Sequence, residues 1–180
     1  MRITIAGAFA SLLLTATVAH ADTQCFSAES VPDGVSYHVR NGIAAPNHTI
    51  KFVSLTSPDG PPAEGTAKVT SRNVNGTNVK GVELTKIAVR HDATSASAPS
   101  SVLIRYADFG GGVNLRINGV AMVAAHFGQL DGRQIGGATV SVQQTQPGPA
   151  RVGTLRLTGA LASFTVGGQN LLLQQACGTF

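Results

Sequence analysis

The chain has 180 residues, of which 12% are charged and 5% aromatic, and its formal net charge is +4. Its basic residues are dispersed rather than clustered, so a nucleic-acid partner is not expected. The plentiful Gly, Thr, Ser and Val, with no Trp, are typical of a β-rich extracellular protein of one domain.

The first 21 residues have the three parts of a cleavable signal peptide. Arg2 supplies a positive charge, Ile3–Val18 is an apolar run too short to span a bilayer, and Ala19-His20-Ala21 is a small-x-small cleavage site. A buried N-terminal helix is the alternative, although only Ser11 would supply it with a polar face. We expect cleavage after Ala21, which leaves residues 22–180 as a single domain that is secreted or periplasmic, with no transmembrane segment.

The two cysteines, Cys25 and Cys177, lie near the two ends of the predicted mature chain. In an oxidising compartment such a pair is expected to form a disulfide, which would place the first and last strands side by side. Two unpaired thiols are the alternative. No metal or other cofactor is expected, because the chain has no Cys-x-x-Cys and its histidines are scattered singly.

Turn signals recur about every eight to twelve residues, with short β-branched runs between them, which is typical of a β-sandwich or barrel. The pattern predicts strands at Val35–Arg40, Thr49–Ser54, Ala67–Ser71, Val79–Arg90, Val102–Ala107, Val113–Ile117, Val120–Ala124, Ala138–Gln143, Gly153–Leu157, Ala162–Val166 and Asn170–Gln174. We expect an all-β fold, an antiparallel β-sandwich of jelly-roll-like type, with a closed eight-stranded β-barrel as the alternative.

The clearest local pattern is the hairpin around Asn118-Gly119, where apolar and polar residues alternate from Val113 into a two-residue turn. The alternation places Arg116 on the solvent side of its strand, and the same reasoning places Arg105 and Arg156 there on theirs. Three stretches are predicted to be loops because they are polar, small or proline-rich: Pro58–Gly65, Asp92–Ser101 and Gln144–Ala150.

The segment from Tyr106 to Gly112 combines two aromatic residues, one carboxylate and three consecutive glycines between two strands. Tyr106, Asp108 and Phe109 are therefore the candidate rim of a binding site. Aromatic faces stack on sugar rings, a carboxylate accepts hydroxyl hydrogen bonds, and glycines allow close backbone approach. The alternative is a strand connection in which Phe109 packs inward and the glycines form a bulge.

Catalytic residues are not apparent. The chain has no Gly-x-Ser-x-Gly and no His-Glu-x-x-His, and its carboxylates are spread out, mostly beside Gly or Pro, where they are expected to cap turns. A hydrolase would need two of these carboxylates to converge in the fold.

Three motifs of the C-terminal half carry a resemblance: Asn114–Gly119, Leu130–Gly137 and Gly159–Leu171 followed by Cys177. They resemble motifs of uncharacterised secreted bacterial β-sandwich proteins. The resemblance implies the same fold class and brings no assigned activity.

Three functions are compatible with these features. The first is a secreted, non-catalytic binding or surface-associated module, with an extracellular glycan as the expected ligand. The second is a structural or envelope-assembly protein with other envelope proteins as partners, and the third is a hydrolase with dispersed carboxylates.

Overall fold

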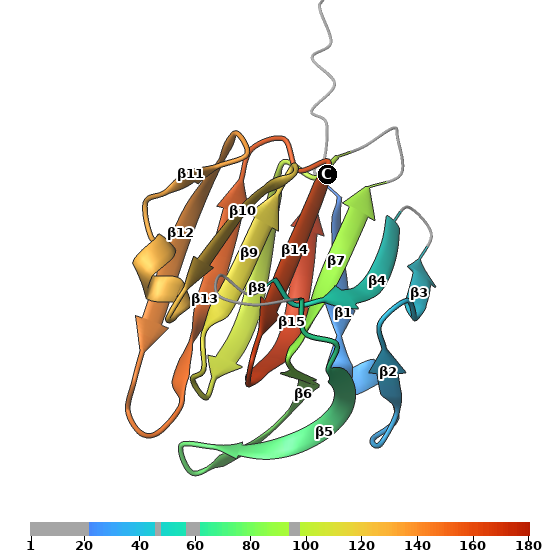
Figure 1. The fold of residues 1–180 in the computed structure, drawn as a ribbon, viewed down its shortest axis with the longest axis vertical. Helices are drawn as coiled ribbons and strands as arrows, with labels where there is room; N and C mark the ends of the chain where they lie inside the picture. The colour runs from blue at the N-terminus through green and yellow to red at the C-terminus, as the bar shows by residue number, and fades with distance from the viewer. Residues whose placement is uncertain (1–21, 46–47, 57–61, 94–97) are drawn as a thin grey trace, which may run out of the picture.

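A computed structural model describes residues 22–45, 48–56, 62–93 and 98–180. The predicted signal peptide, half of the Pro58–Gly65 loop and part of the Asp92–Ser101 loop lie outside these residues. Two antiparallel sheets pack face to face, with the smaller sheet in front in Figure 1. None of the helices in the described part of the chain is long and apolar enough to cross a membrane.

The nine-stranded sheet contains, in pairing order, β11 (Gln134–Ile135), β12 (Ala138–Thr145), β13 (Arg151–Thr158), β8 (Ser101–Asp108), β15 (Leu171–Thr179), β6 (Thr77–Thr85), β5 (Thr66–Val74) and β2 (Ser36–His38), with β1 (Thr23–Ser27) beside β15. The six-stranded sheet contains β10 (Val120–Ala124), β9 (Val113–Ile117), β14 (Ser163–Gly168), β7 (Ile87–Ala93), β4 (His48–Ser54) and β3 (Gly42–Ala45). Two short 3-10 helices cover Ala28–Ser30 and Phe127–Leu130.

Four antiparallel strand pairs nest inside one another along the chain: β9 with β10, β8 with β13, β7 with β14, and β6 with β15. Successive pairs alternate between the two sheets. This is the pairing of a jelly roll, in which one long antiparallel ribbon rolls up into two facing sheets. The predicted jelly-roll-like sandwich is confirmed, and the closed eight-stranded barrel is wrong because the described strands form two separate sheets.

The core lies between the two sheets and follows the period-2 alternation of the strands. On β9, Val113, Leu115 and Ile117 are each at most 1% exposed and point inward, whereas Arg116 points out to solvent. The predicted exposure of Arg105 and Arg156 on the other sheet is also confirmed.

The two ends of the described chain are joined through β1 and β15. Cys25 lies directly opposite Cys177 in the β1–β15 register, and the two form the predicted disulfide, with their Cα atoms 4.0 Å apart. One edge of β15 is shared, because Leu171–Leu173 pairs with β6 and the residues after the bulge pair with β1. The first and last strands are therefore neighbours, as predicted.

The prediction of one strand over Val79–Arg90 is wrong, because the segment forms β6 in one sheet and β7 in the other. The chain turns at Lys86, whose φ of 54° lies in the left-handed region. No Gly, Asn or Pro marks this turn in the sequence, so the continuous β-branched pattern hid it. The short strands β3 and β11 and the first strand β1 were also not predicted.

A second, smaller apolar cluster lies outside the main core and includes one residue of the β5–β6 hairpin, Val74. Its other members are Ala107, Ala150 and Leu172. In Figure 1 the hairpin curves across the bottom of the sandwich. Its tip is fixed by Asn75, whose Nδ2 donates to the carbonyl oxygen of Ala150 at 3.1 Å and whose Oδ1 accepts from the Ala150 N–H at 3.4 Å.

Candidate functional site

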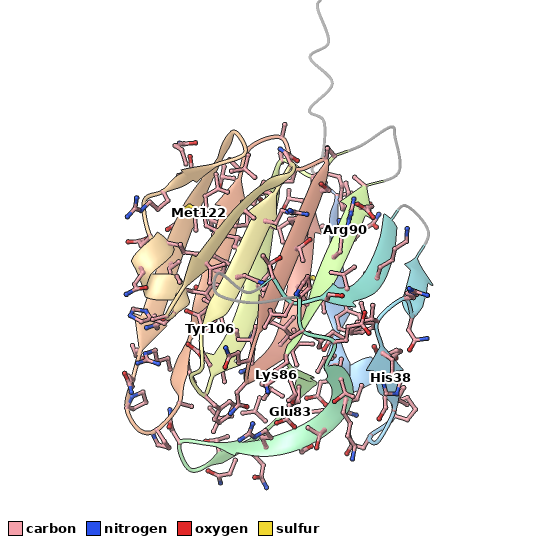
Figure 2. The ribbon with its side chains drawn as sticks, in the orientation of Figure 1. His38, Glu83, Lys86, Arg90, Tyr106 and Met122 are labelled. Carbon is pink, nitrogen blue, oxygen red and sulfur yellow. A yellow bond between two sulfur atoms is a disulfide. The ribbon has the colours of Figure 1, made fainter. Side chains whose placement is uncertain are left out.

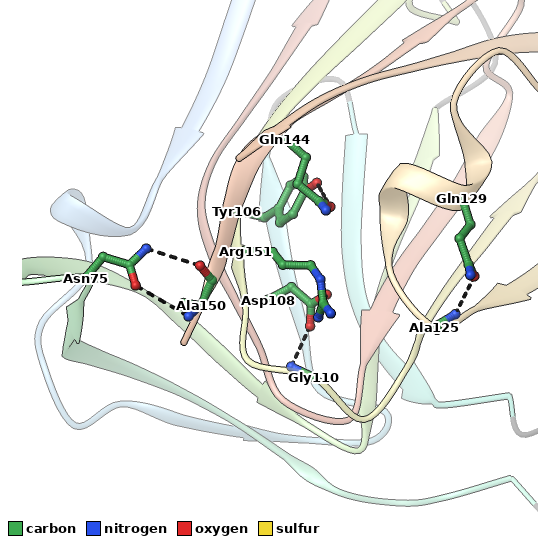
Figure 3. A network of polar contacts seen from close by, with 9 residues as sticks. All are labelled: Asn75, Tyr106, Asp108, Gly110, Ala125, Gln129, Gln144, Ala150 and Arg151. Carbon is green, nitrogen blue, oxygen red and sulfur yellow. Dashed lines mark hydrogen bonds and ion pairs between the residues drawn. The ribbon is translucent and has the colours of Figure 1, made fainter. Parts of the chain in front are cut away.

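Tyr106, one of the predicted rim residues, lies inside the sandwich. Its side chain is 1% exposed and meets the ring of Phe127 edge-on, with 4.8 Å between ring centroids. Its hydroxyl donates to Oε1 of Gln144 at 2.9 Å, across the position of Gly153, which has no side chain to block it (Figure 3). Burial raises the pKa of the Tyr106 phenol above its usual range, and the nearby Asp108 carboxylate raises it further.

Asp108 is also buried, with 1% of its surface exposed, at the end of β8. Its Oδ1 accepts from the backbone N–H of Gly110 at 2.8 Å, which fixes the start of the glycine turn (Figure 3). Its Oδ2 has no hydrogen-bond partner, and Nη1 of Arg151 lies 3.9 Å away. The carboxylate therefore supports the turn between β8 and β9.

Phe109 is half-buried beneath the guanidinium group of Arg72, whose Cζ lies 3.7 Å from the ring centroid. The same guanidinium donates to Oε1 of Glu83 at 2.6 Å and to Oδ1 of Asn170 at 2.9 Å. The ion pair with Glu83 fixes the Arg72 guanidinium, and the cation–π contact of that guanidinium holds the Phe109 ring in place. The predicted rim side chains are thus engaged in packing and turn contacts. Gly111 and Gly112 line one cavity, and Tyr106 lines another on the side of the nine-stranded sheet.

Three cationic residues, one threonine and one alanine lie in a row on the outward face of the six-stranded sheet, as neighbours in register. From β4 to β10 they are Lys51, Arg90, Thr165, Arg116 and Ala121, a set called here the cationic row. Arg90, labelled on β7 in Figure 2, is 46% exposed, and its Nε donates to Oδ1 of Asp92 at 2.8 Å.

Beside the cationic row, on the same face of the sheet, lies a row of small residues that is shielded from solvent. Ala88 and Gly167 pair in register, and both are buried although they point away from the core. Asn114, beside Gly167, is 6% exposed because its Nδ2 donates to the carbonyl oxygen of Thr56 at 3.0 Å. Thr56, just after the end of β4, therefore lies over this part of the outer face.

Two cavities on this side of the molecule share the lining residues Thr56 and Asn114. The first, called here the arginine groove, has a volume of about 470 Å³ and is lined by Val53, Ser54, Thr56, Pro62, Arg90, Asn114, Leu115, Arg116, Ala121 and Thr165. The second, called here the glycine groove, has a volume of about 580 Å³, and Lys86, Gly111, Gly112, Gln129 and Gln169 are among its lining residues. Both volumes fall within the range of about 300–1,000 Å³ typical of small-ligand sites.

The lining of the two grooves combines cationic groups, hydroxyls and carboxamides with small apolar residues. Among the described lining residues of both grooves there is no Asp or Glu. Asp131 lies elsewhere and caps a turn, since its Oδ1 accepts from the N–H of Val142 at 2.7 Å. In the described part of the chain no three of His, Cys, Asp and Glu gather as metal ligands would.

Sequence reasoning identified only part of this face. The exposure of Arg116 and the glycines at 110–112 were noted, but Arg90, Thr165 and the role of Asn114 were missed. Arg90 and Thr165 carry no local signal, because they join Arg116 only through the long-range pairing of β7, β14 and β9.

Comparison of the chain with protein-family models, with curated proteins and with solved structures found no match. The resemblance of the C-terminal half to secreted bacterial β-sandwich proteins therefore stays a prediction, and the candidate site depends on its own geometry.

Proposed function

We propose that the protein is a secreted, non-catalytic binding module whose ligand is an extracellular glycan, bound in the grooves on the outer face of the six-stranded sheet. The observation that carries this proposal is the pair of ligand-sized grooves sharing Thr56 and Asn114. Their hydroxyl, carboxamide and guanidinium groups are the kinds of group that hydrogen-bond sugar hydroxyls.

Export is part of the proposal. The predicted signal peptide leads to an oxidising compartment, and the Cys25–Cys177 disulfide is a bond that persists in such a compartment. The ligand would then be a component of a cell surface or of the extracellular medium.

The positions of the carboxylates support a binding protein rather than a hydrolase. A glycosidase requires two convergent carboxyl groups beside the bound sugar. Among the described residues, neither groove is lined by a carboxylate, and Asp108 and Asp131 serve separate turns.

A blocking variant tests the proposed site. The purified protein is passed over a panel of immobilised neutral and acidic polysaccharides, and we expect retention on at least one. Ala121→Trp should abolish this retention, because Ala121 is exposed and lines the arginine groove, so that an indole ring there fills it. Ser141→Trp, an exposed position on the outer face of the other sheet, is the matched control and should be retained like the parent.

Absence of retention on every polysaccharide would contradict the proposed function. Retention that Ala121→Trp leaves unchanged would contradict the proposed site.

A further inference from the structure

We propose that the arginine groove selects a saccharide that carries carboxylate groups, of the uronate type, and that Arg90 and Arg116 bind the carboxylates. This inference rests on the proposed function, because it names the ligand class of the same site. A guanidinium group presents two parallel N–H donors that match the two oxygens of a carboxylate.

The two arginines are placed to act together. Arg90 and Arg116 lie on strands that both pair with β14, each directly opposite Thr165. Neighbouring strands are about 4.8 Å apart, so the two backbones are about 10 Å apart and Thr165 lies midway between them. The Thr165 hydroxyl can then bond a sugar hydroxyl while the guanidinium groups bind acidic substituents on either side.

Arg90 is held in position before a ligand arrives. Its Nε is engaged by Oδ1 of Asp92 at 2.8 Å, a contact that leaves the two Nη groups for another acceptor. Asp92 offsets one positive charge of the face, yet Lys51 and Arg116 have no ion-pair partner within the described ranges. The cationic row therefore keeps an excess of positive charge.

The described lining of the groove is cationic and polar. Its described lining residues include two arginines and no Asp or Glu, together with the hydroxyls of Ser54, Thr56 and Thr165. This combination fits a ligand with both carboxylates and hydroxyls, because each kind of group on the ligand finds its partner.

The exposed arginines of the other sheet provide a comparison. Arg105 and Arg156 are also exposed, on β8 and β13. The shallow cavity on that side is lined by Arg105 but not by Arg156. Arg90 and Arg116 both line the arginine groove, whereas Arg105 and Arg156 do not share the cavity on their side, so the Arg105 and Arg156 pair is a matched control for charge.

The test measures binding of the purified protein to polygalacturonate, to the same polymer with its carboxyl groups methyl-esterified, to dextran sulfate and to duplex DNA. We expect polygalacturonate to bind at least tenfold more tightly than the methyl ester. Arg90→Gln and Arg116→Gln should each weaken binding roughly tenfold, the loss typical of a charge-assisted hydrogen bond. The double variant Arg105→Gln/Arg156→Gln removes as much charge as both substitutions together and should change binding less than twofold.

The outcomes separate this inference from the proposed function. Equal binding of the ester and the acid would overturn the inference while supporting a glycan site. Dextran sulfate or DNA binding as tightly as polygalacturonate would overturn it in favour of a general polyanion site. Binding to none of the probes, together with retention on a neutral polysaccharide, would overturn the inference alone, whereas loss of all saccharide binding would overturn both. A melting temperature within 2 °C of the parent, roughly the shift for 1 kcal/mol or less, shows that a variant is folded.

Discussion

Arg90 and Arg116 face solvent from the same side of the six-stranded sheet, each opposite Thr165 in register. Asp92 holds Arg90 through Nε, and the residues after β4 bound the groove through the hydrogen bond from Asn114 to Thr56. Strand pairing, rather than any contiguous motif, therefore brings the two guanidinium groups to one cavity.

Removing the disulfide should destabilise the fold strongly. The Cys25–Cys177 bond joins positions 152 residues apart and fastens β1 to β15, so its loss frees nearly the whole chain in the unfolded state. Loss of such a bond costs about 2–5 kcal/mol, which corresponds to a lower melting temperature by about 5–20 °C. Thermal unfolding of Cys25→Ser/Cys177→Ser measures the shift, and addition of reductant to the parent should reproduce it. An unchanged melting temperature would contradict the role given to the bond.

The buried phenol of Tyr106 should make the protein less stable at high pH. Because burial raises its pKa in the folded state, the unfolded chain loses this proton first, above its ordinary pKa of about 10. The unfolded state then binds fewer protons than the folded state, so the free energy of unfolding falls as pH rises above 10. Denaturant unfolding at pH 9 and pH 11 should show a smaller fall for Tyr106→Phe than for the parent.

At neutral pH the same variant, Tyr106→Phe, should be about 1 kcal/mol less stable, because it loses the hydrogen bond to Gln144. Tyr37→Phe, on the half-buried Tyr37 ring that stacks on Phe52, serves as the control for the alkaline effect. An alkaline loss that Tyr106→Phe leaves intact would assign the effect to other groups.

Asp108 should stabilise the fold mainly through its hydrogen bond to Gly110. Asp108→Ala removes the acceptor for that N–H and should cost about 1–3 kcal/mol. Asp108→Asn keeps an oxygen at the same place and should cost less than half as much, because the contact with Arg151 is long, at 3.9 Å. Urea unfolding compares the two variants, and equal losses would show that the charge of Asp108 matters more than its hydrogen bond.

A methyl group at position 167 should disturb the floor beneath the arginine groove. A Cβ added to Gly167 would lie 2.5 Å from Cβ of Ala88 and 2.8 Å from Oδ1 of Asn114, so one of these neighbours must shift. We expect Gly167→Ala to lose about 1–3 kcal/mol of stability, as overpacked sites do. Ala88→Gly in the same chain should recover part of the loss. If Gly167→Ala were as stable as the parent, the close packing of the two strands would be contradicted.

Local features of the fold were predictable from the sequence. The β9–β10 hairpin was predicted at the observed residues, because its alternation and its Asn118-Gly119 turn are properties of neighbouring positions. Both turn residues adopt positive φ, 47° and 89°, as such a turn requires. The disulfide was predictable because the chain has two cysteines, one near each predicted mature end.

Features that depend on distant pairing were not predictable. The crossing from β6 to β7 depends on Lys86 adopting a positive φ, for which its residue type gives no signal. Asn114 points away from the core, like Arg116 on the same strand, but it is buried because Thr56 covers it. The arginine groove combines residues from five separate strands with Thr56 and Pro62, so one sequence contains no local pattern for it.

The most direct test of a uronate site in the arginine groove is a titration of the isotope-labelled protein with a short galacturonate oligosaccharide. The readout is the change in the amide chemical shifts. We expect saturable shifts concentrated at Arg90, Thr165, Arg116 and Ala121, with Thr56 and Asn114 at the edge of the affected surface. The amide chemical shifts of three residues on the opposite sheet should not change: Arg105, Thr154 and Gln143. Saturable shifts centred on that opposite sheet, or no shifts at either face, would contradict a uronate site in the arginine groove.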